Sequence, residues 1–197
     1  MGSDRPARGR AMGCDGDGAP WIAETAIVEE GVSLGPRVRV WHHAQVRVGA
    51  SVGEGVVLGK GCFVDEGVVI GRGSKVQNGA QLYAPAVLED GVFVGPMVVL
   101  TNDRFPRAMG PQGVEMGKAD WRAIGCQIGC GASLGAGSMI VCTTVGAWAM
   151  VGAGSVVTKP VPSHALVFGV PARQVGWVCR CGVRQRASCP TCGWTAA

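Results

Sequence analysis

A six-residue repeat runs through most of this 197-residue chain and constrains its fold more than any other feature. In steps of six from Val28 to Leu100, every position is aliphatic, and the position four residues after each one is small or β-branched up to Val98. A β-sandwich would instead alternate with a period of two between irregular turns. The six-residue period therefore predicts an all-β chain, a parallel β-helix of short strands in which each coil pairs with its neighbours.

The composition agrees with a packed repeat and excludes several other classes. Glycine accounts for 33 residues, and a glycine often follows the aliphatic position directly, as in Leu58-Gly59. Glycines suit corners that need positive φ or a close approach of two backbones. Because 47% of the residues are hydrophobic and no glycine period of three is present, neither a disordered nor a collagen-like chain is expected.

Charge and hydropathy limit the possible partners. No apolar run approaches the length of a membrane span, so no membrane partner is expected. Residues 21–172 carry eleven basic and eleven acidic groups, which leaves no basic surface for nucleic acid. Residues 1–20 lack the apolar core of a signal peptide and are expected to form a disordered polar leader.

The repeat is interrupted once. Its phase is lost after Leu100 and resumes at Ile128, so residues 101–127 are expected to form a loop that protrudes from the β-helix. Long excursions from a rigid scaffold commonly carry function, and this loop is the best candidate for substrate contact. The step from Ile140 to Val145 is five residues, which predicts one shortened corner. Residues 163–178 are expected to form an irregular end segment.

The hexads match the pattern [LIV]-[GAED]-x-x-[small]-x and resemble those of bacterial hexapeptide-repeat acyltransferases over roughly residues 22–178. Three stretches narrow the resemblance: Val40-Trp41-His42, the segment from Gly95 to Ala108 with its Thr-Asn-Asp and Phe-Pro-Arg elements, and the segment from Val151 to Lys159. They are similar to N-acetyltransferases of nucleotide-linked 3-amino sugars, in particular the UDP-2-acetamido-3-amino-2,3-dideoxyglucuronate N-acetyltransferase group. The resemblance implies a left-handed helix, a homotrimer, and acyl-CoA bound between subunits.

The function implied by the resemblance is transfer of an acetyl group from acetyl-CoA to the 3-amine of a UDP- or dTDP-linked sugar. Its setting would be cytoplasmic synthesis of surface polysaccharide or of a glycosylated natural product. Two alternatives remain open: an O-acetyltransferase of the same fold, and a non-enzymatic β-helix scaffold with a zinc tail. A γ-class carbonic anhydrase is disfavoured, since it needs three histidine ligands from adjacent coils and two of the three histidines here are adjacent.

Candidate catalytic residues lie in the loop and near the N-terminal coils. By resemblance, Asn102 would accept a hydrogen bond from the sugar amine and orient it, although an Asn-Asp pair can equally form a turn. Asp103 could act as a general base only if burial raised its pKa. His42 is a further base candidate because imidazole transfers protons near neutral pH, and a structural polar contact is the alternative.

Candidate binding residues flank the loop and the distal end of the repeat. Arg104 and Arg107 could pair with a nucleotide diphosphate, or could simply solubilise the loop. The resemblance also implies five cofactor-binding positions. Gly135, Gly152 and the adjacent Ala153 lie at corners of the repeat, and the cations Lys159 and Arg173 could reach the CoA phosphates.

The C-terminal tail, residues 179–197, contains a separate motif. Cys179-Arg180-Cys181 and Cys189-Pro190-Thr191-Cys192 form C-x-C and C-x2-C pairs separated by seven residues. Four thiolates at this spacing can surround a tetrahedral Zn²⁺ with no open position, which makes the expected site structural. Free thiols in a disordered tail are the alternative.

Overall fold

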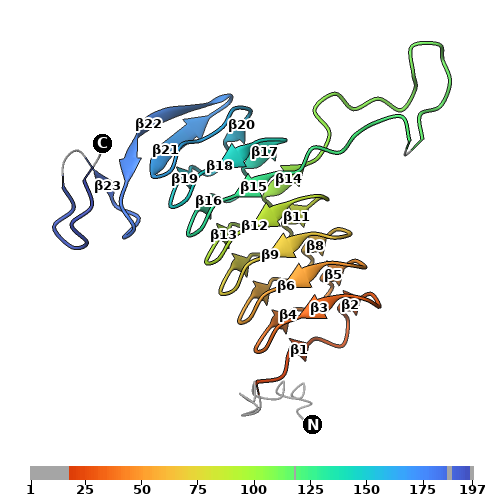
Figure 1. The fold of residues 1–197 in the computed structure, drawn as a ribbon, viewed down its shortest axis with the longest axis horizontal. Helices are drawn as coiled ribbons and strands as arrows, with labels where there is room; N and C mark the ends of the chain where they lie inside the picture. Colours follow the sequence, from red (N-terminus) through yellow and green to blue (C-terminus); the bar gives the residue numbers. More distant parts are fainter. Residues whose placement is uncertain (1–17, 118, 186–187, 196–197) are drawn as a thin grey trace, which may run out of the picture.

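A computed structural model describes residues 18–117, 119–185 and 188–195 as an all-β column of stacked coils (Figure 1). Each of the first six coils contains one strand from each of three parallel sheets, here called A, B and C, so that strand n pairs with strand n + 3. The predicted parallel β-helix is confirmed. The expected leader falls mostly outside the described residues, which begin at Gly18. The described part contains no helix, and hence none that could cross a membrane.

The strands are mostly two residues long, and their bounds follow the hexads. Sheet A contains β1 (Trp21–Ile22), β4 (Arg39–Val40), β7 (Val57–Leu58), β10 (Lys75–Val76), β13 (Phe93–Val94), β16 (Ser133–Leu134), β19 (Met150–Val151), β21 (Ala165–Gly169), β22 (Ala172–Val178) and β23 (Arg184–Gln185). Sheet B contains β2 (Ile27–Val28), β5 (Gln45–Val46), β8 (Phe63–Val64), β11 (Gln81–Leu82), β14 (Val99–Thr101), β17 (Met139–Val141) and β20 (Val156–Val157). Sheet C contains β3 (Ser33–Leu34), β6 (Ser51–Val52), β9 (Val69–Ile70), β12 (Val87–Leu88), β15 (Gln127–Ile128) and β18 (Thr144–Val145).

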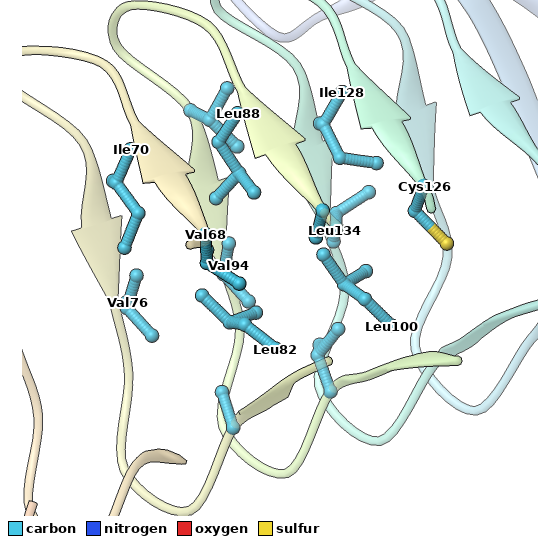
Figure 2. Close-up of a cluster of buried hydrophobic side chains, with 14 of the residues drawn as sticks. Val68, Ile70, Val76, Leu82, Leu88, Val94, Leu100, Cys126, Ile128 and Leu134 are labelled. Atoms are coloured by element: carbon cyan, nitrogen blue, oxygen red, sulfur yellow. The ribbon is translucent and has the colours of Figure 1, made fainter. Parts of the chain in front are cut away.

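The core is a line of aliphatic side chains along the axis of the column. In each coil the second residue of the strand points inward, and successive coils stack these residues into ladders, as Ile70, Leu88 and Ile128 of sheet C show in Figure 2. The small hexad positions are also buried, for example Val68 at 0% exposure. Because each rung buries the same pattern, the core is continuous from end to end.

The glycines of the repeat fall into two classes with different physical reasons. A Cβ on Gly53, directly after an inward aliphatic residue, would lie 2.6 Å from the backbone nitrogen of Arg72 in the next coil, so no side chain fits there. Gly55, two residues later, has open space around it but a φ of 68°. The first class is required by close stacking and the second by a left-handed corner, as the composition predicted.

The interruption confirms the predicted loop and refines its end. Val94 pairs with Leu134, a separation of 40 residues, whereas the coils before the loop repeat after 18, as in Trp21 with Arg39. The register resumes earlier than expected, because Cys126 fills a small inward position at 0% exposure. The predicted short corner before Val145 is also confirmed.

The end of the β-helix is more regular than the sequence indicated. Residues 163–178 were expected to be irregular, yet β21 and β22 form an antiparallel hairpin that extends sheet A, with a register shift between Leu166 and Val167. The expectation was wrong because the hexad pattern stops there while strand pairing continues. β23 adds a further antiparallel strand, so the tail begins on the edge of the same sheet.

Candidate active site and cysteine cluster

The loop leaves the column at the corner between sheets B and C, here called edge BC, and its two ends are held together. The backbone N–H of Ile124 donates to the carbonyl oxygen of Asn102 over 2.8 Å. The side-chain amide nitrogen of Asn102 donates to the carbonyl of Ala84, one coil below, over 2.7 Å. A Cβ on Gly125 would lie 2.1 Å from the carbonyl oxygen of Pro85, so the returning strand packs directly on the preceding corner.

Sulfur and hydroxyl groups pack behind the root of the loop. The Cys126 thiol donates to the carbonyl oxygens of Thr101 and Ile140, each over 3.3 Å. Burial raises the pKa of the Cys126 thiol, so it is a structural group and not a nucleophile at neutral pH. Arg104 donates from its guanidinium to the carbonyl of Cys142 over 3.1 Å, which ties the start of the loop to the next coil.

Beyond the root, the loop is a short hairpin far from the column (Figure 1). Met109 and Glu115 form an isolated antiparallel bridge near its tip. The Asp103 carboxylate accepts the backbone N–H of Phe105 over 2.8 Å and thereby shapes the turn. Several large apolar side chains of the hairpin point into solvent, including Phe105 at 80% exposure and Val114 at 67%. The hairpin therefore offers an unsatisfied apolar surface.

His42 lies at the corner between sheets A and B, here called edge AB, in the second coil. Its Nδ1 and the Thr25 hydroxyl share a hydrogen bond of 2.9 Å across neighbouring coils. Asn102 lies on edge BC in the fifth coil, and three rungs correspond to roughly 14 Å along the axis. The chain therefore does not bring His42 and Asn102 together. His43 occupies the left-handed corner position, with a φ of 59°.

The expected CoA-binding residues are also split between edges. Gly135, Gly152 and Ala153 lie on edge AB of the sixth and seventh coils. A Cβ on Gly135 would lie 2.5 Å from the nitrogen of Ala153, so this glycine has a structural reason of its own. Lys159 is exposed on edge BC in the seventh coil, two rungs beyond the loop, and Arg173 is exposed near the tip of the β21–β22 hairpin.

An ion-pair cluster below the loop was not singled out from the sequence. Asp65 accepts the backbone N–H of Ala84 over 3.2 Å and also faces the guanidinium of Arg47. Arg47 in turn pairs with Glu29 over 3.2 Å. The backbone N–H of Val48 and the Arg47 guanidinium lower the pKa of Glu29. Glu29, Arg47 and Asp65 follow one another at a spacing of 18 residues. An alignment of the sequence coil by coil could have found this signal.

A second feature unforeseen from the sequence is a shallow hollow of about 330 Å³ on the outside of sheet C. It spans the fourth to seventh coils, and both polar and apolar residues line it: Glu89, Gln127, Ile128, Gly129, Thr144, Val145, Gly146, Ala147 and Ser163. The hollow is open and lies one strand away from the root of the loop.

The four tail cysteines form one cluster. The sulfur atoms of Cys179, Cys181, Cys189 and Cys192 all lie within 4.8 Å of one another, and none is in a disulfide. Loss of hydration opposes ionisation of Cys179, yet hydrogen bonds from the backbone of Val183 and from neighbouring thiols lower its pKa to about 6. Hydrogen bonding to Cys192 raises the pKa of Cys181 to about 12. Protonation of Cys179, Cys181 and Cys192 is therefore interdependent.

Comparison with known families and proteins agrees with the repeat. Residues 49–84 and 126–159 match the family described as the hexapeptide repeat of succinyl-transferase. A 52-residue segment is 58% identical to the dTDP-3-amino-3,6-dideoxy-alpha-D-galactopyranose 3-N-acetyltransferase of Aneurinibacillus thermoaerophilus, covering 26% of this chain and 27% of the relative. A 52-residue segment is 54% identical to serine acetyltransferase 4 of Arabidopsis thaliana, covering 26% of this chain and 15% of the relative.

Solved structures with related coils include PerB from Caulobacter crescentus in complex with CoA and GDP-perosamine, at 24% identity and a TM-score of 0.45, covering 80% of this chain and 57% of that one. The acetyltransferase domain of PglB from Neisseria gonorrhoeae with acetyl coenzyme A has 19% identity and a TM-score of 0.47, covering 80% and 58%. The chain thus spans about a quarter of the first curated relative and just over half of these structures.

Proposed function

We propose that this hexapeptide-repeat protein is an acetyltransferase that moves the acetyl group of acetyl-CoA to the 3-amine of a UDP- or dTDP-linked amino sugar. The observation that carries the proposal is the 58% identity over 52 residues with a 3-N-acetyltransferase of a dTDP-linked 3-amino sugar. The fold by itself does not select a substrate. The left-handed sense of the coils is part of the same proposal.

Asn102 is the residue we assign to the acceptor amine. Its amide nitrogen is held by the Ala84 carbonyl, so the amide plane is fixed and its oxygen can accept a hydrogen bond. Within the described ranges that oxygen has no other hydrogen bond. An amine hydrogen bonded there would have its lone pair directed away from Asn102. That orientation suits attack on a thioester carbonyl brought to the other side of the nitrogen.

The reaction is an addition followed by an elimination. The amine nitrogen bonds to the thioester carbon, the C–S bond breaks, and the proton lost by nitrogen ends on the departing CoA sulfur. Backbone N–H groups at glycine corners are the donors we assign to the transient oxyanion. The proposal assigns no protein base: Asp103 is engaged in the loop turn, and His42 lies about 14 Å away along the axis.

The cations of the loop have different roles in this proposal. Arg104 holds the loop to the Cys142 carbonyl, which supports a positioning role. Arg107 is exposed and donates only to the neighbouring Pro106 carbonyl within the described part of the chain, so its guanidinium is the better partner for a nucleotide diphosphate. Lys159 and Arg173 are exposed near the same end of the column and are assigned to the CoA phosphates.

A homotrimer would complete the site. The candidate residues lie on different edges of one chain, so a groove that uses them together requires edges of separate copies. The exposed apolar side chains of the loop support its packing on a neighbouring copy. A cytoplasmic location is proposed because the described cysteines form no disulfides, which are common in oxidising compartments.

O-acetyl transfer is the second candidate, because one relative with comparable identity is a serine acetyltransferase. A hydroxyl is far less nucleophilic than an amine and needs a base. His42, with its Nδ1 held by Thr25, is the residue assigned to that role. N-acetyl transfer requires Asn102 and O-acetyl transfer requires His42, so substitutions of these two residues distinguish the candidates.

The test is to incubate the full chain with acetyl-CoA and a panel of UDP- and dTDP-linked 3-amino sugars and to detect products by mass spectrometry. We expect a 3-acetamido product with one nucleotide. Asn102→Ala should reduce kcat about 10²-fold, a loss typical of a positioning hydrogen bond near the reacting atoms. Asn78→Ala is the matched control, because Asn78 also bonds a corner backbone, the N–H of Lys60, but lies on edge AB.

Each alternative outcome is informative. Acetylation of a sugar hydroxyl that depends on His42 and not on Asn102 would replace N-acetyl by O-acetyl transfer. No product from any amine or hydroxyl, together with no binding of CoA, would favour a scaffold that only presents its surfaces. Equal activity of Asn102→Ala and wild type would remove Asn102 from the site.

A further inference from the structure

We propose that Cys179, Cys181, Cys189 and Cys192 bind one structural Zn²⁺ and that the metal-folded tail caps the last coils of the β-helix. This inference is independent of the proposed acetyl transfer. A site with four thiolate ligands leaves no position for substrate, so the metal would stabilise structure and take no part in the reaction.

The geometry of the cluster suits a tetrahedral ion. With Zn–S bonds of 2.3 Å, the sulfurs of a regular tetrahedron lie about 3.8 Å apart. The four sulfurs here lie within 4.8 Å of one another. Each pair contributes one buried and one exposed cysteine, with Cys179 and Cys189 at 2% and 3% exposure. Four uncoordinated thiols crowded in this way would gain little, whereas four thiolates around a dication would each gain a strong bond.

A glycine closes a backbone turn at each cysteine pair. The backbone N–H of Gly182 donates to the carbonyl of Cys179 over 2.9 Å, and the N–H of Gly193 donates to that of Cys189 over the same distance. Both glycines follow the second cysteine of their pair and have positive φ, 76° and 68°. The first turn spans four residues and the second five, so the shorter C-x-C pair has the tighter turn, and both pairs place their sulfurs in one cluster.

Both turns are attached to one edge of the column, the corner between sheets C and A, here called edge CA. The Trp194 ring stacks on the His164 ring with centroids 4.6 Å apart and an angle of 25°. The Arg180 guanidinium lies 5.3 Å from the centre of the Trp148 ring. Two hydrogen bonds join His164 to Val178. The backbone N–H of Val178 donates to the His164 carbonyl over 2.8 Å, and the His164 Nδ1 lies 2.9 Å from the Val178 carbonyl oxygen.

These contacts explain an otherwise costly choice of residues. Trp148 and His164 occupy left-handed corner positions, with φ of 59° and 63°, where most coils use glycine. A large side chain there carries a backbone cost, and each of these two contacts the tail. Because the last strands of a solenoid otherwise leave a free sheet edge, a metal-folded tail on this corner provides the cap that such a fold needs.

The experiment uses the full chain, purified without added metal, with zinc and iron measured by inductively coupled plasma mass spectrometry. We expect about one zinc per chain after dialysis against a weak chelator. Cys192→Ser should lose most of this zinc, whereas Cys130→Ser should keep it. Cys130 is the matched control because it is a half-buried free thiol on edge CA outside the cluster.

Limited proteolysis tests the capping part. Removal of zinc by a strong chelator should expose residues 179–195 to cleavage and leave the coils intact, and added Zn²⁺ should restore protection. Three results would overturn the proposal: iron in place of zinc, unchanged zinc in Cys192→Ser, or a tail that resists protease equally with and without metal. Acetyl transfer should persist after chelation, so failure here and failure of the proposed activity are distinguishable.

Discussion

The loop at residues 102–126 and the tail at residues 179–195 both depart from the repeat, but they are held in opposite ways (Figure 1). Among the residues that the structure describes, the bonds of Asn102 and Arg104 fix the loop at its root, and large apolar side chains are exposed further out. The tail is attached by strand pairing at β23 and by ring stacking at Trp194, and it buries one cysteine of each pair.

The difference indicates what each segment needs to become fully ordered. The apolar surface of the loop can be covered only by another molecule, such as a neighbouring copy or a bound substrate. The unsatisfied groups of the tail are thiols that one small ion can bind. Rigid coils therefore position both segments, while different ligands would complete them.

The largest expected effect comes from disturbing the root of the loop. Gly125→Ala places a Cβ against the Pro85 carbonyl, which should cost about 2 kcal/mol and lower the Tm by roughly 4–8 °C. The proposed transferase activity should fall at least about tenfold, because Asn102 bonds Ile124 next to the clash. Calorimetry and product mass spectrometry measure the two effects.

Gly117→Ala is the matched control for that variant. Gly117 lies within the loop, and a Cβ there would meet its nearest atom, on Asp120, only at 3.7 Å. We expect its Tm to match wild type. Equal losses in both variants would mean that the loop responds as a whole and that its root has no special importance.

An intermediate effect is expected from removing the aromatic contact of the tail. Trp194→Ala deletes the stack on His164, worth about 1 kcal/mol, and should speed transfer of zinc to a colorimetric chelator about fivefold. Trp121→Ala removes a tryptophan of the loop and should leave zinc transfer unchanged. Identical rates of zinc transfer in the two variants would mean that the tail retains its metal independently of the contact between Trp194 and His164.

The smallest effect concerns which thiols react with iodoacetamide at neutral pH. Burial raises the pKa of Cys62 to about 12, so its reactive thiolate forms only far above neutral pH, and Cys126 is shifted in the same direction. Peptide mass spectrometry should find both unlabelled until the coils unfold. The tail cysteines should become labelled once a chelator is added, and labelling of Cys126 under the same conditions would contradict a rigid loop root.

Much of the fold follows from local pattern. The coil register, the loop and the short corner before Val145 were predictable, because each rung repeats the same inward residues and any departure breaks the phase. The β21–β22 hairpin was not predictable from hexads, since antiparallel pairing with a register shift has no six-residue signature. Cys126 was missed as a core residue because nothing local distinguishes its thiol from a loop cysteine.

The candidate site was less accessible to such reasoning. The family resemblance identified Asn102 as a candidate and imidazole chemistry identified His42, but only the stacking of coils assigns them to different edges and different heights. The turn made by Asp103 and the anchor made by Arg104 depend on backbone groups that sequence patterns do not place. The spacing of the four cysteines predicted their cluster, whereas its attachment through Trp194 and His164 did not follow from any motif.

Local order in this protein is thus encoded residue by residue, because a coil needs only an inward aliphatic side chain, a small one, and glycines where backbones touch or turn left-handed. Relations between distant segments arise from the three-dimensional stack. Edges are created only when coils superimpose. A residue pairs with the coil above or below it, which lies 16, 17, 18 or 40 residues away in the sequence. For that reason the repeat could be recognised in the linear chain, while the loop root and the docked tail required the folded column.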